Sequence, residues 1–339
     1  MAFQLGVMLR GQYEHGADMA AKADEMIEQA KFADRLGYAS ITKGSHYSTD
    51  AFQAFQQFPV LARLSGEVKQ ARLNAGIVLL ALQKPLDMAE QLASIDILSK
   101  GRLIFGVGLG YRDVEFKAFG TSRKDRGKRT TENLIAIKRL WAEDKVSMKG
   151  SHFELDEAVC WPKPIQQPHP PIWIGANADV ALKRAAEHGD CWYINPHNTL
   201  DTVARQLDIY KGFLDAAGKS FPTELPMRRE AFVARTKEEA LKLAGPFVAK
   251  KYAAYHAWGQ DDDMPEDESL AGGLEDIIGD RFLIGSPDEV AEQMIGINRK
   301  LGVNHLILSM EWAGMEKSVA MDCMQMMAEE VMPRVRQGV

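Results

Sequence analysis

Three glycines at alternating positions, Gly106, Gly108 and Gly110, end a short apolar segment of the chain. Because glycine has no Cβ, the backbone there can come close to a bound ring or phosphate group. The segment lacks the third glycine of a dinucleotide-binding fingerprint, since Tyr111 stands in its place, and no Gly-Lys-Ser/Thr follows as in a P-loop. It therefore predicts either a close backbone approach to a cofactor or only a tight turn from a strand into a helix.

A second candidate site is the run Gly175-Ala176-Asn177-Ala178, which joins an apolar strand pattern to a helical one. Unpaired N–H groups and the positive end of the helix dipole make such a junction suitable for an anion. Asn177 also has the residue type of a helix N-cap. The two interpretations are compatible, and we predict a phosphate-binding segment here.

Ser45-His46-Tyr47 follows the second expected strand. A histidine at the carboxyl end of such a strand could donate a hydrogen bond or move a proton near neutral pH. A single histidine in a loop is also often only a polar surface residue. The sequence contains no His-Glu-x-x-His pattern and no Gly-x-Ser-x-Gly elbow, which argues against a zinc site and a serine hydrolase.

Strand patterns alternate with amphipathic helix patterns from end to end, as in a (β/α)₈ barrel. The expected strands are Phe3–Leu9, Tyr38–Thr42, Leu73–Leu82, Arg102–Leu109, Ile172–Gly175, Cys191–Asn195, Met227–Ala234 and Asn304–Met310. The expected helices are Asp18–Leu36, Ala51–Leu64, Pro85–Leu98, Arg129–Ala142, Ala178–His188, Leu200–Ala217, Lys237–Trp258, Pro287–Leu301 and Ser318–Arg336. In such a barrel the candidate segments all lie at the carboxyl ends of the strands, where active sites form.

Two stretches interrupt this alternation and predict insertions before strand five and before strand eight. Val146–Trp161 has the pattern of a hairpin around Lys149-Gly150 and is followed by the proline-rich stretch Pro162–Pro171. Gly259–Gly285 shows no regular pattern, and its acidic run is typical of a solvated loop. No low-complexity linker divides the chain, so we expect residues 1–339 to form one domain.

The composition excludes several partners. The 41 Lys and Arg residues are scattered among 47 Asp and Glu residues, so no basic stripe for nucleic acid exists, and the net charge of −6 mildly disfavours a strongly anionic substrate. No apolar run is long enough to span a membrane, no signal peptide is visible, and three distant cysteines suggest no disulfide framework. We expect a cytoplasmic protein without a bound metal.

Several runs, in order along nearly the whole chain, resemble the signature of the bacterial-luciferase-like oxidoreductases. They are Ser99–Tyr111 with Glu115–Gly120, Pro171–Gly175, Gly189-Asp190, Gly285–Glu292 and Glu329–Pro333. The resemblance implies a (β/α)₈ barrel, often dimeric, that binds reduced FMN, or in some branches a deazaflavin, over the carboxyl ends of its strands. It also implies a cis peptide between Gly76 and Ile77 beneath the flavin.

The resemblance assigns roles to the candidate residues. His46 would hydrogen-bond the flavin or manage a proton, beside Ser45, which replaces a His or Asp common in the family. Gly76, Ile77, Gly108, Gly110 and Tyr111 would contact the cofactor. Leu109 stands where luciferases carry a phosphate-binding Arg, so the phosphate would rest on Gly175, Ala176, Asn177 and Ala178, helped by Arg126 or Arg129. Trp312 would shape an apolar substrate pocket.

The resulting prediction is a two-component monooxygenase that takes reduced FMN from a separate reductase and uses dioxygen on a small, largely apolar substrate. The irregular stretches 111–125 and 259–285 would exclude water from the site. Two alternatives remain open: a deazaflavin-dependent dehydrogenase or reductase, and a non-catalytic flavin-binding subunit. The sequence does not identify the substrate.

Overall fold

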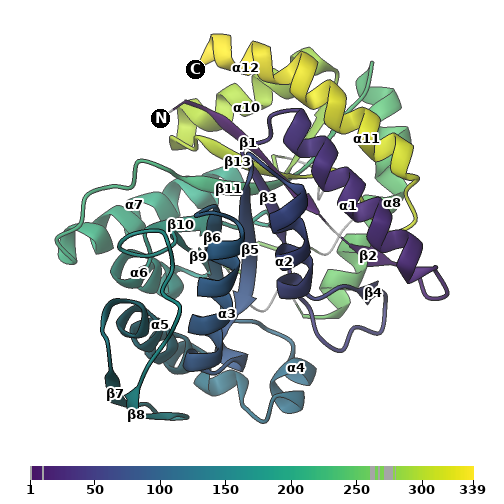
Figure 1. Cartoon of the computed structure of the whole chain (residues 1–339). Helices are drawn as coiled ribbons and strands as arrows, with labels where there is room; N and C mark the ends of the chain where they lie inside the picture. The colour runs from purple at the N-terminus through teal and green to yellow at the C-terminus, as the bar shows by residue number, and fades with distance from the viewer. Residues whose placement is uncertain (1, 10, 260–263, 266–267, 271–277, 279) are drawn as a thin grey trace.

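The computed structural model describes every residue except 1, 10, 260–263, 266–267, 271–277 and 279 (Figure 1). Eight parallel strands form a closed barrel, in which each strand pairs with the next and the last pairs with the first. This confirms the predicted (β/α)₈ architecture. The barrel strands are β1 (Gln4–Leu9), β3 (Ser40–Lys43), β5 (Arg72–Leu79), β6 (Leu103–Gly108), β9 (Ile172–Ala176), β10 (Cys191–Ile194), β11 (Pro226–Val233) and β13 (His305–Ser309).

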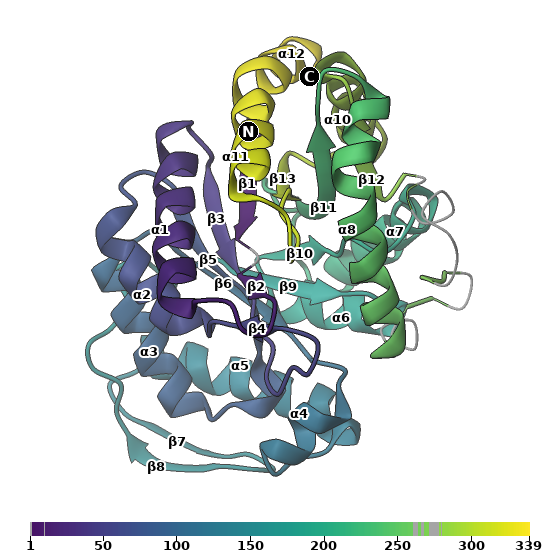
Figure 2. The ribbon, with the colours of Figure 1, turned by 90° about the vertical axis from the view of Figure 1, so that its right-hand side faces the viewer.

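Helices surround the strands on the outside, and in Figure 2 α1 and α8 flank the strands on opposite sides. Their apolar stripes face the strands, which accounts for the three- and four-residue spacing in the sequence. The described helices are α1 (Met19–Arg35), α2 (Gln57–Glu67), α3 (Pro85–Leu98), α4 (Asp113–Ala118), α5 (Arg126–Ala142), α6 (Asp179–His188), α7 (Leu200–Ala216), α8 (Lys237–Ala257), α10 (Pro287–Leu301), α11 (Lys317–Met326) and α12 (Met332–Gly338).

Local signals in the sequence explain several helix ends. Asp18 caps α1 by accepting hydrogen bonds from the N–H groups of Ala20 and Ala21. Ser286 and Glu289 form a complete capping box at the start of α10, with Pro287 in the first turn. Gly302 ends α10 in the left-handed conformation at φ 72°. These signals fixed the predicted bounds of α10 to the residue.

Several predicted segments differ from the structure, among them the stretch 111–125, which was expected to be irregular and contains α4. The expected helix Ala51–Leu64 begins only at Gln57, because β4 (Gln53–Ala54) pairs antiparallel with β2 (Gln12–Tyr13). The stretch Gly259–Gly285, expected to be irregular, contains β12 (Phe282–Gly285), which pairs in parallel with the second half of β11. Residues 260–263, 266–267, 271–277 and 279 of that stretch lie outside the described part.

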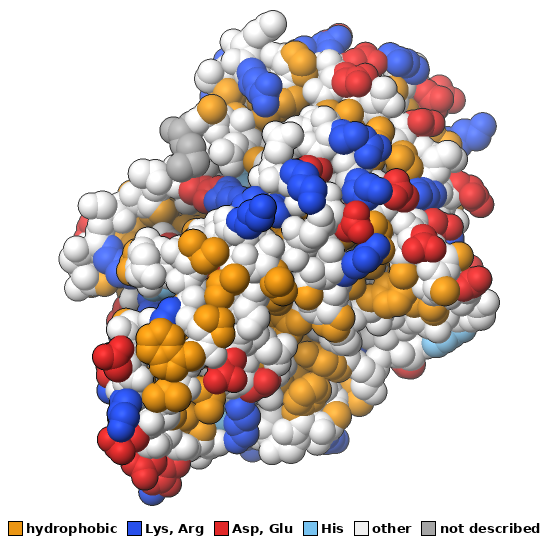
Figure 3. Space-filling view, in the orientation of Figure 1, with side chains coloured by type: hydrophobic (Ala, Val, Ile, Leu, Met, Phe, Trp, Pro, Cys, Tyr) orange, Lys and Arg blue, Asp and Glu red, His pale blue; other side chains and the backbone are white. Residues whose placement is uncertain are grey.

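The predicted hairpin before strand five is confirmed. It consists of β7 (Val146–Lys149) and β8 (Glu154–Ala158), which pair antiparallel. Side chains near this insertion leave large apolar surface exposed, notably Trp161 at 61% and Ile165 at 53%. On the face of the molecule seen in Figure 3, apolar side chains gather over the middle and lower part, and charges of both signs lie over the upper part. No described helix is long and apolar enough to cross a membrane.

A buried polar cluster lies at the amino-terminal end of the barrel. His305 contacts Glu224 at 2.8 Å through Nδ1 and Ser40 at 2.9 Å through Nε2. Burial would raise the pKa of Glu224, but His305 and Arg72 outweigh it and lower this pKa to about 2. Burial also lowers the pKa of His305. The folded chain therefore binds protons at this cluster less readily than the unfolded chain does.

This cluster predicts acid sensitivity. The stabilisation from Glu224 is complete above pH 4.5 and is lost as the pH falls toward 2, and that from neutral His305 declines below pH 6.5. We expect the free energy of unfolding to fall by roughly 2 kcal/mol between pH 7 and 3 through Glu224 alone. Urea unfolding between pH 7 and 3 measures this, with Glu224→Gln as the comparison. An unchanged pH dependence in Glu224→Gln would contradict the assignment.

Candidate active site

A cavity of about 270 Å³ opens at the carboxyl ends of the barrel strands. Its lining comes from strands β1, β3, β5, β6, β9, β10 and β11 and from the segments that follow them. All the predicted catalytic and cofactor-binding residues line this one cavity: Ser45, His46, Gly76, Ile77, Gly108, Gly110, Tyr111, Gly175, Ala176, Asn177 and Ala178. Their roles remain predictions, but the structure brings them together.

The floor of the cavity depends on the glycines of β6. A Cβ added at Gly108 would lie 2.0 Å from Cδ1 of Ile77, and one added at Gly106 would lie 2.8 Å from the carbonyl oxygen of Ala75. The peptide bond between Gly76 and Ile77 is cis, as the resemblance implied. The glycines therefore let β5 and β6 approach closely, and Ile77, rather than the bare glycine backbone, presents the apolar surface to the cavity.

The junction between β9 and α6 has the form of an anion site. Asn177 is not the N-cap of α6; Ala178 is, and no side chain caps this helix start. The N–H of Ala181 donates to the carbonyl oxygen of Ala178 at 2.9 Å, so the N–H groups of Asp179 and Val180 are the ones left to a ligand, and the helix dipole favours a negative charge there. Asp179 in the same turn is held by Arg205 at 2.5 Å and Gln206 at 3.0 Å.

One of the two arginines considered for the phosphate lies at the cavity. Arg126 lines it and donates from Nη1 to the carbonyl oxygen of Gly110 at 2.8 Å. Arg129 donates to the carbonyl oxygen of Ala81 and is not among the lining residues. Arg126 is therefore the arginine placed to help hold a phosphate.

His46 lies in front of a buried carboxylate that the sequence analysis did not single out. Its Nδ1 is 3.5 Å from Oε1 of Glu115, whose side chain is 1% exposed. The N–H of Tyr47 donates to the same oxygen at 2.9 Å, and Arg112 lies 3.6 Å from it. Because Nδ1 faces Glu115, Nε2 is the ring nitrogen left to meet a ligand.

The side-chain amide of Gln56 also holds the loop that carries His46. Ser45 donates from Oγ to Oε1 of Gln56 at 2.8 Å, and Nε2 of Gln56 donates to the carbonyl oxygen of His46 at 2.9 Å. Ser45 therefore positions the loop through Gln56. Tyr255 and Trp258 of the α8 end also contact the His46 ring, at 6.5 and 5.8 Å between centroids.

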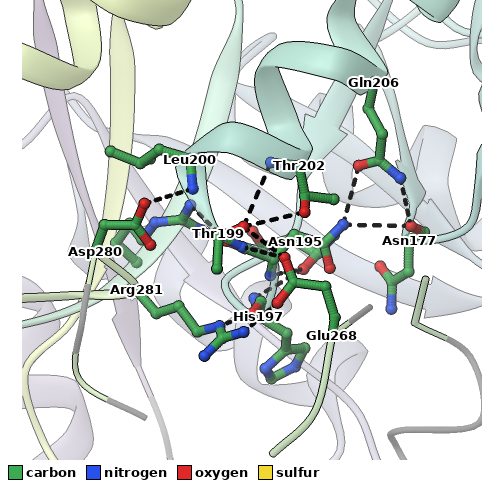
Figure 4. A network of polar contacts seen from close by, with 12 residues as sticks. Asn177, Asn195, His197, Thr199, Leu200, Thr202, Gln206, Glu268, Asp280 and Arg281 are labelled. Atoms are coloured by element: carbon green, nitrogen blue, oxygen red, sulfur yellow. Dashed lines mark hydrogen bonds and ion pairs between the residues drawn. The ribbon is translucent and has the colours of Figure 1, made fainter. Parts of the chain in front are cut away.

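The segment after β10 supplies further cavity residues that the sequence analysis missed, and Figure 4 shows the contacts that hold it. Arg281 donates from Nε to the carbonyl oxygen of His197 at 2.5 Å and pairs with Glu268. Oε1 of Glu268 in turn accepts from the backbone N–H and the hydroxyl of Thr199, both at 2.7 Å. This network fixes a segment that has no regular secondary structure.

The same network joins the two loops that flank the cavity. Nε2 of Gln206 donates to the carbonyl oxygen of Asn177 at 2.8 Å, and Nδ2 of Asn198 donates to that oxygen at 3.3 Å (Figure 4). Asn198 also donates to Oε1 of Gln206 at 2.9 Å. The anion-binding segment and the segment after β10 therefore keep a fixed separation.

Trp312, predicted to shape the substrate pocket, lies in the core. It is 2% exposed, packs against Phe232 and Phe282, and donates from Nε1 to Glu230 at 2.9 Å. It is not among the residues that line the cavity. The pocket role stays untested, and any influence on a ligand would pass through Glu230. Of the two stretches predicted to exclude water, 111–125 contributes Tyr111 to the lining, and 259–285 lies largely outside the described residues.

The residues at the cavity fit a flavin mononucleotide. Polar atoms of the segment after β10 have no hydrogen-bond partner among the described residues, namely Nδ2 of Asn195 and Nδ1 of His197. Burial holds the pKa of His197 well below its usual range, helped by Lys251 and Arg228, so this ring is neutral at pH 7. A planar heterocycle could lie on Ile77 and meet these atoms, with its phosphate at the start of α6. No metal-binding cluster occurs among the described residues.

The sequence profile of the luciferase-like monooxygenases matches residues 3–305. This match covers most of the chain, so the protein belongs to the luciferase-like monooxygenase family, as the resemblance predicted.

Named relatives include enzymes that use different cofactors. The oxygenase component of a flavin-dependent trigonelline monooxygenase from Acinetobacter baylyi is 30% identical over 69% of this chain and 66% of its own length. An FMNH(2)-dependent dimethylsulfone monooxygenase from Pseudomonas putida is 29% identical over 86% and 82%. An F420-dependent glucose-6-phosphate dehydrogenase from Amycolatopsis mediterranei is 25% identical over 97% and 99%. Among solved structures, a monooxygenase from Streptomyces bottropensis shares the fold with a TM-score of 0.86, at 24% identity over 97% and 99% of the two chains.

Proposed function

We propose that the protein is a flavin-dependent monooxygenase that uses reduced FMN and dioxygen on a small organic substrate. One observation carries this proposal: an apolar floor, an uncapped helix start and a histidine backed by a buried carboxylate meet in one cavity. The trigonelline and dimethylsulfone monooxygenases among its relatives support the same reading.

In this proposal each part of the chain has a separate task. The start of α6 and Arg126 would hold the phosphate, and Ile77 would support the ring. Reduced FMN, when bound, supplies the electrons that activate dioxygen. His46 would move a proton at Nε2 while Glu115 and the backbone of Tyr47 keep the ring oriented. Tyr111 and the segment after β10 would limit the entry of water.

The proposal includes partners outside the chain. A separate reductase would supply reduced FMN, as suggested by the trigonelline monooxygenase relative, which is an oxygenase component. We also propose a homodimer in the cytoplasm. Sedimentation of the purified chain tests the homodimer, since a dimer doubles the mass of 37.7 kDa.

A second candidate is a deazaflavin-dependent dehydrogenase, which the F420-dependent relative favours because the match spans almost the whole of both chains. The apolar surface of Ile77 and the uncapped start of α6 suit either cofactor. Dioxygen consumption with product formation across a substrate panel supports the monooxygenase. Flavin-dependent peroxide release without product across a broad panel would instead favour a non-catalytic flavin-binding subunit.

A further inference from the structure

The charged side chains among the described lining residues of the cavity are all cations. Its lining includes Lys43, Arg126 and Arg228, and no Asp or Glu occurs among the described lining residues. The whole chain carries more acidic than basic residues, with a net charge of −6. Local cations in a concave site attract anions regardless of the net charge of the protein.

Two of the three cations already have evident tasks. Arg126 donates to the carbonyl oxygen of Gly110 and lines the same cavity as Ala178 and Val180 at the start of α6. Lys43 lies beside Gly11 and donates to the carbonyl oxygen of Gly44 at 3.1 Å. Burial lowers the pKa of Lys43 to about 8, so this ammonium group is costly to keep charged. These contacts of Arg126 and Lys43 do not account for the third cation of the lining, Arg228.

Arg228 comes from β11 and points into the barrel. Its Nε donates to Oγ of Ser309 at 3.2 Å, and Nη2 lies 3.6 Å from Oε1 of Glu230. No other hydrogen-bond partner of this guanidinium occurs in the described part of the chain. The side chain is 18% exposed whereas that of Glu230 is fully buried, and the exposed part of Arg228 lines the cavity.

Glu230 does not need Arg228 for charge balance. Its carboxylate forms an ion pair with the buried Lys251 and accepts a hydrogen bond from Trp312 at 2.9 Å. Arg228 therefore lies 3.6 Å from a carboxylate that is already engaged, and the part of its guanidinium side chain that remains exposed faces the cavity. A partly buried cation is stabilised when an anion approaches it, and the cavity is the side from which one can do so.

We propose that Arg228 binds an oxyanion group of the organic substrate, so that the substrates are small organic carboxylates or sulfonates with an apolar body. This inference rests on the proposed function and refines the small, largely apolar substrate expected from the sequence. A guanidinium presents parallel N–H groups that match two oxygens of such a group. The hydroxyls of Tyr193 and Tyr255 lie close enough to Arg228 to influence its charge, and both residues line the cavity.

The test compares anionic and neutral probes of the same shape. Benzoate is paired with benzamide and hexanesulfonate with hexanesulfonamide, and binding is measured without oxygen on full-length protein that contains reduced FMN. The variants are Arg228→Gln, Arg228→Lys and, as a matched control, Arg63→Gln on the exposed face of α2. Because Lys251 and Trp312 keep Glu230 paired, Arg228→Gln should fold, which circular dichroism checks.

We expect wild type to bind the anions at least tenfold more tightly than the amides. Arg228→Gln should abolish that preference, Arg228→Lys should keep part of it, and Arg63→Gln should match wild type. Equal or undetectable binding of both probes by wild type, or a preference that survives in Arg228→Gln, overturns the proposal. So does a tenfold loss of reduced-FMN affinity in Arg228→Gln without a change in probe preference, since Arg228 would then serve the flavin.

The proposed function can fail separately. If wild type does not bind reduced FMN, that function is refuted, and the same probes are titrated with inorganic phosphate in place of the flavin to occupy the anion site at α6. If the anionic probes bind more tightly than the amides in the presence of phosphate, and Arg228→Gln abolishes this preference, the role of Arg228 is supported. If the preference is absent, the role of Arg228 is overturned.

Discussion

A His46→Ala variant is expected to oxidise substrate about 10² to 10⁴ times more slowly than wild type, the range that a positioned proton-transfer group contributes. His46 lines the cavity, and Glu115 behind it leaves Nε2 as the nitrogen that meets a ligand. Alanine removes that group without removing the loop contact of Ser45 with Gln56. The initial rate of product formation, measured with reduced FMN supplied in excess, gives the effect.

The control is His15→Ala, which removes an exposed imidazole whose Nε2 lies 2.9 Å from the carbonyl oxygen of Asp50. It should oxidise substrate at the wild-type rate. If His46→Ala folds, binds flavin normally and oxidises substrate as fast as wild type, His46 has no part in the reaction.

Gly108→Ala is expected to weaken the binding of reduced FMN by about ten- to a hundredfold, or roughly 1.4 to 3 kcal/mol. The new methyl group would lie 2.0 Å from Cδ1 of Ile77, so the isoleucine side chain must move. Ile77 is packed from below by β6, which leaves the cavity as the direction in which it can shift. The variant therefore changes the surface on which the ring would rest. Quenching of flavin fluorescence in an anaerobic titration measures the affinity.

A matched glycine lies outside the site. A Cβ added at Gly212 on α7 meets no atom within 4 Å, so Gly212→Ala should bind reduced FMN as wild type does. Wild-type affinity in a folded Gly108→Ala variant would show that the ring does not lie against Ile77.

Much of the fold could be predicted because its signals are local. The buried parallel strands have nearly continuous apolar runs, and helix caps such as Ser286 and the glycine after α10 stand at defined positions. The short strand Phe282–Gly285 was missed because four residues inside an irregular stretch carry no period of their own. Pairing with β11, a contact distant in sequence, determines that strand.

The site was predictable only in part. Its glycine-rich segments and His46 follow strand patterns, so the barrel brings them to one end. Glu115 and Arg228 do not stand directly after a strand pattern. Glu115 lies in the short helix α4, and Arg228 lies inside a strand beside Arg229. Strand alternation places Arg228 and Glu230 on the same face but does not say whether that face lies inside the barrel.

The net charge was a poor guide to the ligand for a related reason. Most acidic residues lie outside the cavity, where they do not cancel the field of Arg228 inside it. An apolar floor beside Arg228, whose nearest carboxylate is already paired with Lys251, suits a molecule with one charged end. Composition averages over these two regions and hides the difference.

The identity of the cofactor is tested most directly by an anaerobic titration of the wild-type chain with reduced FMN and, separately, with reduced deazaflavin. We predict saturable binding of one reduced FMN per chain at micromolar or lower concentration, and much weaker binding of the deazaflavin. Tight binding of the deazaflavin with no saturable binding of reduced FMN would contradict the proposed monooxygenase and favour the dehydrogenase.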